Sequence, residues 1–186
     1  MNSELEKGLM LECHLSQKNF NSNANKINWG NGGKRGGFDY NPPLVWKGIG
    51  LNVLGKYDNG NNDWLNKNGN NNEWAVAYHS TNAKVLKFIL EGGFRIGPGQ
   101  NCKDYDDIYH PGHKVGVGVY VTPDSKTMEE FAKNNVININ GKKYLIALML
   151  RVKPDKIRCP SGYQNFWIVN ASPDEIRPYR ILLKEI

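Results

Sequence analysis

The sequence predicts an α+β protein with a split, mostly antiparallel β-sheet core, few short helices and a loop-rich N-terminal arm. Short apolar runs that are typical of strands recur through the second half of the chain. Helical spacing of apolar residues occurs only in a few short segments, and Asn and Gly dominate the chain before residue 74. Because so few helices cannot cover both faces of a parallel sheet, an antiparallel sheet is favoured over a doubly wound one.

Length and composition indicate one compact domain with a modest core, since the chain has 186 residues and 39% of them are hydrophobic. No stretch approaches the roughly 20 apolar residues of a membrane span, and the first residues lack the pattern of a secretory signal. Cys13, Cys102 and Cys159 are too widely spread for a disulfide framework. We therefore expect an intracellular protein, cytoplasmic or nuclear, with no membrane partner.

The net charge of +6 at pH 7 comes from scattered basic residues rather than from a continuous basic block. This distribution argues against a dedicated stripe for binding nucleic acid. The same charge suits a smaller anion equally well, such as the pyrophosphate of a dinucleotide.

Residues 1–73 are expected to form an Asn- and Gly-rich arm, and residues 74–186 the main domain. Stretches such as "NSNANKINWGNGGKRGGF" favour turns, because Gly and Asn tolerate positive φ and Asn competes with the backbone for hydrogen bonds. Aromatic and aliphatic residues interrupt these stretches more often than a disordered linker requires. We therefore predict an ordered arm packed on the domain, with a short strand near 50–54.

The main domain begins with an apolar strand and an amphipathic helix. The sequence "WAVAY" at 74–78 is typical of a short buried strand. The segment "NAKVLKFILEGG" at 82–93 then places four aliphatic side chains on one helical face: Val85, Leu86, Ile89 and Leu90. Residues suited to capping stand at both ends of this helix: Thr81 or Asn82 before it, and Gly92 or Gly93 after it.

The later part of the chain alternates between Gly-rich and apolar segments. Residues 97–114 are rich in Gly, Asp and His and predict a loop, and "VGVGVYV" at 115–121 predicts a strand whose glycines allow close backbone approach. Thr122 can cap and Pro123 can open a short helix in "TPDSKTMEEFAKN". Three apolar runs then predict the closing strands: "YLIALMLRV" at 144–152, "FWIV" at 166–169 and "YRILL" at 179–183.

Four motifs in the main domain follow one another in the order and spacing of a known family. They resemble the catalytic domain of the diphtheria-toxin-like ADP-ribosyltransferases, with the PARP enzymes as the closest members. That family has a His-Gly-Ser/Thr segment at a strand end, then a Gly-x-Gly-x-Tyr strand, a second aromatic residue about eleven positions later, and an arginine after the helix. The matching residues are His79, Ser80 and Thr81, then Gly116, Gly118 and Tyr120, with Phe131 and Arg95.

The resemblance implies an enzyme that uses NAD as a co-substrate, transfers ADP-ribose to a protein or nucleic-acid acceptor, and releases nicotinamide. It implies that Tyr120 and Phe131 stack on the two faces of the nicotinamide ring. A cationic ring gains about 0.5–2 kcal/mol per face from such contacts. His79 would hydrogen-bond the ribose hydroxyls in a fixed tautomer. Ser80 stands where the family has glycine and would hold the carboxamide through its backbone.

The resemblance places four further residues at the NAD site. Thr81 would add a hydroxyl to the same carboxamide, and Arg95 would approach the adenylate half of NAD. Gly118 would let its strand come close to the ligand. Phe166 would stand beside the ligand at the start of a late strand. No metal ion is implied.

One element of the family is missing, because no glutamate opens the late strand "YQNFWIVN". Aligning the aliphatic pair "IV" of this strand with that of the family puts Phe166 at the glutamate position. Asn165 lies one residue before Phe166, and Gln164 lies two residues before it. Gln164 and Asn165 therefore join His79 and Tyr120 as candidate catalytic residues, although an amide can only hydrogen-bond and cannot offset positive charge. Family members without the glutamate are typically mono-ADP-ribosyltransferases or inactive, so we expect transfer of a single ADP-ribose.

Two other functions stay open at this point. One is a catalytically inactive module of the same fold that binds NAD or ADP-ribose, or presents a protein interface. The other is a relative of the RNA 2′-phosphotransferases, which ranks last because it needs several arginines and only Arg95 lies near the motifs. The nearest acids to the late strand, Asp174 and Glu175, follow it in a turn and are expected to be solvated.

Two loop regions have competing interpretations. The loop "CKDYDDIYHPGHK" holds potential zinc ligands at Cys102, Asp106, Asp107, His110 and His113, but their spacing is loose. We prefer a loop that shapes the acceptor site. In the arm, the side chains of Tyr57, Asp58 and Trp64 are interpreted either as a lid over the NAD site or as anchors of the arm on the core.

Overall fold

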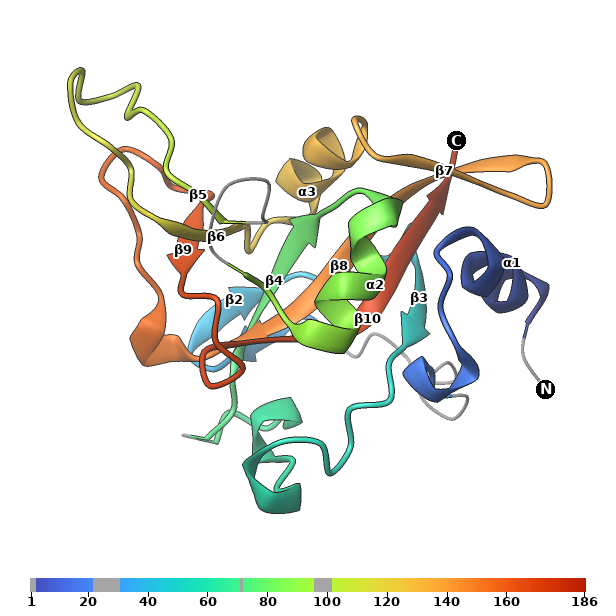
Figure 1. Cartoon of the computed structure of the whole chain (residues 1–186). Coiled ribbons are helices and arrows are strands. Elements are labelled where there is room, and N and C mark those ends of the chain that lie inside the picture. The colour runs from blue at the N-terminus through green and yellow to red at the C-terminus, as the bar shows by residue number, and fades with distance from the viewer. Residues whose placement is uncertain (1–2, 22–30, 71, 96–101) are drawn as a thin grey trace.

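A computed structural model describes residues 3–21, 31–70, 72–95 and 102–186, and shows an α+β architecture (Figure 1). Its α-helices are α1 (Glu4–Glu12), α2 (Ala83–Gly92) and α3 (Ser125–Ala132). Its strands are β1 (Gly33–Arg35), β2 (Phe38–Tyr40), β3 (Lys47–Gly50), β4 (Ala75–Ser80), β5 (Cys102–Lys103), β6 (Gly118–Val121), β7 (Val136–Ile139), β8 (Lys142–Val152), β9 (Trp167–Val169) and β10 (Ile176–Glu185). Short 3₁₀ turns occur at Gln17–Asn19, Asp58–Gly60, Asp63–Leu65 and Pro154–Lys156.

The strands form a central sheet, a smaller sheet and a hairpin. The central sheet has the order β3-β10-β8-β4, with β7 also paired to β8, and the smaller sheet has the order β5-β6-β9. Strands β1 and β2 form the hairpin, and the strand pairs of all three units are antiparallel. An antiparallel bridge between Tyr78 of β4 and Thr122 joins the two sheets. The predicted α+β class and the split, mostly antiparallel sheet are therefore confirmed.

Strand β8 is the centre of the core, because its residues 144–152 are all buried. Alternate side chains of a strand point to opposite faces of the sheet. Ile146, Leu148 and Leu150 belong to the apolar cluster that contains the buried face of α2. Ala147 and Met149 belong to a second cluster, on the side of α3. The continuous apolar run in the sequence thus reflects a strand that is covered on both faces.

The helix ends follow local capping chemistry. The side chain of Asn82 accepts a hydrogen bond from the Lys84 amide at 2.8 Å, and Gly93 ends α2 with a φ of 76°. Helix α3 begins at Ser125, two residues later than the expected opening at Pro123. Its cap is Asp124, whose carboxylate accepts from the Thr127 amide at 2.7 Å. A carboxylate at a helix N-terminus also interacts favourably with the helix dipole, which an expected cap at Thr122 would not.

The N-terminal arm contributes to the central sheet itself. Strand β3 pairs with β10 from Lys47 opposite Leu183 to Gly50 opposite Arg180. The strand expected near 50–54 therefore lies about three residues earlier, because its position is set by the register with β10 and not by its own apolar content. Helix α1 packs against β7 at another place in the same sheet.

Candidate functional site

A cleft of about 620 Å³ lies where the two sheets meet, beside α3. Five of the candidate NAD-site residues line it: His79, Ser80, Tyr120, Phe131 and Phe166. They come from four places in the fold, namely the end of β4, the middle of β6, the helix α3 and the turn before β9. The fold thus brings together residues that are up to 87 positions apart in the chain (from 79 to 166).

His79 is fixed by the junction between β4 and β6. Tyr78 and Thr122 exchange two backbone hydrogen bonds of 2.8 and 3.0 Å, which place His79 beside β6. The Nδ1 atom of His79 lies 2.9 Å from the carbonyl oxygen of Tyr120. A carbonyl only accepts, so Nδ1 carries the proton and donates, and Nε2 is the acceptor nitrogen of the neutral ring. The ring of Phe94 meets the imidazole edge to face at 5.3 Å.

Burial lowers the pKa of His79 below its ordinary value of 6.5, although the hydrogen bond to Tyr120 opposes this shift. The folded protein therefore binds fewer protons than the unfolded chain just below pH 6.5. His79 contributes stability above that pH, and the contribution is lost as the pH falls through the lowered pKa.

We expect wild-type protein to lose more unfolding free energy between pH 7.5 and pH 5 than the His79→Gln variant. Urea unfolding at both pH values measures this, and equal losses would contradict it.

The ring of Tyr120 is held by contacts at its hydroxyl group and at its edge. The hydroxyl donates to the Gly116 carbonyl at 2.6 Å and accepts from the Tyr105 amide at 3.4 Å. The Tyr105 ring meets it edge to face, with the ring centroids 4.9 Å apart. Burial raises the pKa of Tyr120, so the phenol stays neutral and acts as a donor. These contacts fix the orientation of the Tyr120 ring, which lines the cleft.

The other aromatic residues of the cleft come from α3 and from the turn before β9. Phe131 is 45% exposed, and its ring lies 5.4 Å from that of the half-buried Phe166 in an edge arrangement. Tyr163 extends the group, 6.2 Å from Phe166. Exposed aromatic rings around a cleft supply flat apolar surfaces on which a planar ligand can stack.

Ser80 has a partner that the sequence did not reveal. Asn135, which follows α3, donates from Nδ2 to the Ser80 hydroxyl oxygen at 2.8 Å, and Asn135 also lines the cleft. This contact joins β4 to the end of α3 at the cleft floor. Asn135 lies 55 positions from Ser80, and nothing in the local sequence marks it.

Thr81, Arg95 and Gly118 do not line the cleft. Thr81 is buried behind it, with 5% of its surface exposed. Arg95 is exposed, and its guanidinium folds back over Gly92 of α2. The segment 96–101, which follows Arg95, lies outside the described residues. A Cβ atom at Gly118 would stand 2.5 Å from a side-chain carbon of Ile168, so this glycine permits β6 to pack on β9.

Gln164 and Asn165 occupy an exposed turn before β9, and neither lines the cleft. The residue of this segment that reaches the cleft is Phe166. Among the described lining residues, the only carboxylate is Asp106, whose side chain pairs with Lys114 at 2.6 Å. It stands in the exposed loop that the sequence analysis preferred as shaping the acceptor site, although Asp106 itself was considered there only as a potential zinc ligand.

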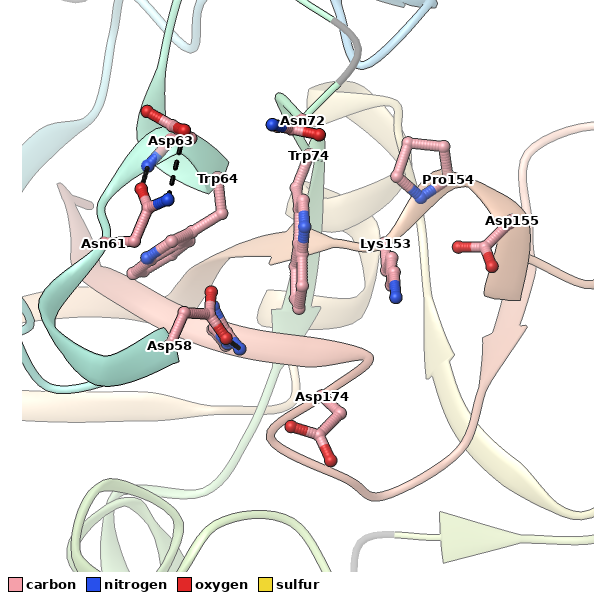
Figure 2. A pocket seen from close by; sticks show the side chains of 11 residues that line it. Asp58, Asn61, Asp63, Trp64, Asn72, Trp74, Lys153, Pro154, Asp155 and Asp174 are labelled. Atoms are coloured by element: carbon pink, nitrogen blue, oxygen red, sulfur yellow. Dashed lines mark hydrogen bonds and ion pairs between the residues drawn. The ribbon is translucent and has the colours of Figure 1, made fainter.

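A second hollow of about 530 Å³ is separate from the cleft, since no described residue lines both. Figure 2 shows side chains that line this hollow. At its base, Arg177 of β10 forms two ion-pair contacts of 2.6 and 2.8 Å with Asp58. The guanidinium also lies 4.2 to 5.1 Å from the ring centroids of three aromatic residues, Tyr57, Trp64 and Trp74. Tyr57, Asp58 and Trp64 thus anchor the arm on β10 and do not cover the cleft.

Asp174 and Glu175 do not line the cleft, and of the potential metal ligands Asp106 lines it. Asp174 lines the second hollow, and Glu175 accepts hydrogen bonds from Asn170. Within the described ranges, no group of three or more His, Cys, Asp or Glu residues is placed to hold a metal ion. His110 instead pairs with Asp107 at 3.0 Å.

No helix in the described part of the chain is long and apolar enough to cross a membrane. Comparison with known proteins identifies no family for this chain, so the cleft is the main guide to its function. No protein-family model matches the chain, and no curated protein matches it.

Proposed function

We propose that this protein is an NAD-dependent mono-ADP-ribosyltransferase of the diphtheria-toxin-like, PARP-like fold. It would transfer one ADP-ribose from NAD to a protein or nucleic-acid acceptor and release nicotinamide. The observation that carries the proposal is the convergence of His79 and Tyr120, from neighbouring strands, on one cleft that Phe131 also lines. The split antiparallel sheets and the ordered sequence motifs support the same assignment, by analogy with that family.

The residues of the cleft fit a planar, positively charged base joined to a sugar. Tyr120 offers a fixed aromatic face and Phe131 a more exposed one, and both attract a flat cation. His79, with its proton held on Nδ1, offers Nε2 as an acceptor for a sugar hydroxyl. The backbone of Ser80, whose side chain is already bonded to Asn135, is available to a carboxamide.

Bound NAD would supply a glycosidic bond whose cleavage develops positive charge on the ribose, as in glycoside hydrolysis. By the sequence resemblance Phe166 corresponds to the family glutamate, and the phenylalanine in this cleft offers no negative charge to stabilise that cation. Asp106 is the one carboxylate among the described residues of the cleft, although Lys114 neutralises part of its charge. This weak electrostatic support favours single transfer over the repeated transfer that makes a polymer.

Nicotinamide release from NAD tests the proposal directly. Wild-type protein is expected to release nicotinamide when an acceptor is supplied as a mixture of cellular proteins or nucleic acids. The His79→Ala variant is expected to release nicotinamide about 100-fold more slowly, because alanine lacks the Nε2 acceptor that would orient a ribose hydroxyl. Phe88→Ala is the matched control, since Phe88 is an exposed residue of α2 outside the cleft. Equal rates for wild type and His79→Ala would contradict the proposal.

The alternative function is an inactive module that binds NAD or ADP-ribose, or presents a protein interface. The specific observation in its favour is Phe166, which occupies the position where the family glutamate is expected. Calorimetric titration with NAD distinguishes the two functions. Tight binding that is lost in His79→Ala, without nicotinamide release by the wild type, would support the module and exclude the transferase.

A further inference from the structure

The segment 104–115 forms a two-stranded finger beside the cleft. Asp106 and Lys114 face each other across an antiparallel bridge in this segment. In Figure 1 the finger runs between β5 and β6 and projects away from the sheets. Three of its residues line the cleft, namely Tyr105, Asp106 and Ile108. The finger therefore forms one wall of the cleft, and the position of that wall depends on what holds the finger.

A nearly buried carboxylate organises the outer half of the finger. The side chain of Asp107 is 9% exposed, and it accepts from the amides of Tyr109 and His110 at 2.9 and 3.2 Å. The Nδ1 atom of His110 lies 3.0 Å from the same carboxylate. The Asp107 amide in turn donates to the His113 carbonyl at 2.9 Å, which ties the two strands of the finger together. The outer half of the finger is thus one ordered piece.

A tyrosine from the opposite wall of the cleft contacts this piece. Tyr163 lies in the turn before β9, and its hydroxyl donates to the Asp107 carboxylate at 3.3 Å and accepts from the Ile108 amide at 3.1 Å. The rings of Tyr163 and Tyr109 meet edge to face, with their centroids 4.7 Å apart. A Cβ atom at Gly162 would stand 2.9 Å from the Tyr109 ring, so the glycine permits this close packing. One hydroxyl and one ring contact therefore seat the finger on the turn.

The same tyrosine belongs to the row of rings on its own side of the cleft. The Tyr163 ring lies 6.2 Å from that of Phe166, which lies 5.4 Å from that of Phe131. On the finger side, the ring of Tyr105 lies 4.9 Å from that of Tyr120. The two rings that the proposed function places on the nicotinamide thus rest on different walls, and the Tyr163 hydroxyl joins those walls. The pairing of β6 with β9 also joins them, but it does not include the finger.

We propose that Tyr163 is a positioning residue for the ligand of the cleft, which acts through Asp107 and Ile108 to hold the finger in place. This inference rests on the proposed function, because it concerns the binding of NAD between the two walls. With the hydroxyl present, the wall is formed before NAD arrives. Without it, fewer molecules have the finger seated, and the apparent affinity for NAD falls in proportion to that fraction. His79 is fixed by the junction of β4 and β6, so it keeps its place.

Steady-state nicotinamide release by the Tyr163→Phe variant tests the proposal. Phenylalanine keeps the ring and removes the hydroxyl. We expect the KM for NAD to rise about tenfold and kcat to stay within about twofold of the wild-type value, since bound NAD itself favours the seated finger. Tyr144→Phe is the matched control. It removes a tyrosine hydroxyl that donates to the Glu185 carboxylate at the same distance of 3.3 Å, and Tyr144 does not line the cleft.

Amide hydrogen exchange measures the contact without NAD. The Ile108 amide donates to the Tyr163 hydroxyl, so it should exchange about tenfold faster in Tyr163→Phe, with an unchanged thermal midpoint of the whole protein. Exchange at the wild-type rate would overturn the proposal, because the hydroxyl would then not hold the finger.

The kinetic outcome separates this proposal from the proposed function. Equal KM values for NAD in the Tyr163→Phe variant and in a wild type that releases nicotinamide would overturn the role of Tyr163 alone. A wild type that neither binds nor cleaves NAD would overturn both, since the positioning role has no ligand to act on.

Discussion

The Tyr120→Ala variant is expected to release nicotinamide about 100-fold more slowly than wild-type protein. Alanine removes the ring that faces the cleft, together with its edge contact to Tyr105. Loss of both stacking and cation–π attraction weakens the hold on a planar cation and its orientation for reaction. Steady-state rates of nicotinamide release, measured at saturating NAD, give the size of the loss.

The Tyr120→Phe variant separates the ring from its hydroxyl. Phenylalanine keeps the aromatic face but loses the hydrogen bonds to the Gly116 carbonyl and the Tyr105 amide. We expect a loss of about tenfold or less, since the ring can still stack but its orientation is less fixed. If the alanine variant retained full activity while the fold stayed intact by circular dichroism, the role of this ring would be disproved.

The Glu73→Gln variant is expected to lower the free energy of unfolding by about 3–5 kcal/mol, the usual cost of removing one partner from a buried ion pair. Glutamine has the same shape and can still accept from the Gly69 amide, which lies 2.7 Å from the Glu73 carboxylate. It cannot balance Arg35 and Arg151, whose guanidinium groups stay buried.

Urea unfolding at neutral pH measures this loss. Glu91→Gln is the matched control. Glu91 is exposed on α2, and its substitution should change stability by no more than about 0.5 kcal/mol. A loss below 1 kcal/mol for Glu73→Gln would mean that the buried arginines are balanced in another way.

The fold class could be predicted because the main elements are encoded locally. The apolar run at 144–152 and the spaced aliphatic residues of α2 each reflect one strand or helix face. The position of β3 was predicted wrongly, because "KGIG" has little strand preference of its own. Its strand is defined by pairing with β10. Pairing across more than 120 residues leaves no signal in a short window of sequence.

Most of the candidate residues that line the cleft stand on a well-defined element, and Phe166, in the turn before β9, is the exception. His79, Ser80 and Tyr120 lie on strands, and the direction of each strand carries them to the cleft. Asn135 and Asp106 reach the cleft from the end of a helix and from a loop, whose paths depend on contacts far away in the chain. Gln164 and Asn165 were expected beside the reacting bond, but the turn before β9 leaves them exposed.

The pairing of β3 with β10 has a consequence for any attempt to divide the protein. A fragment that starts at residue 74 would leave one side of β10 without its hydrogen-bonding neighbour along Arg180–Leu183. A bare apolar sheet border of this kind recruits other extended chains and promotes aggregation. The loop-rich arm therefore also protects the main domain from self-association.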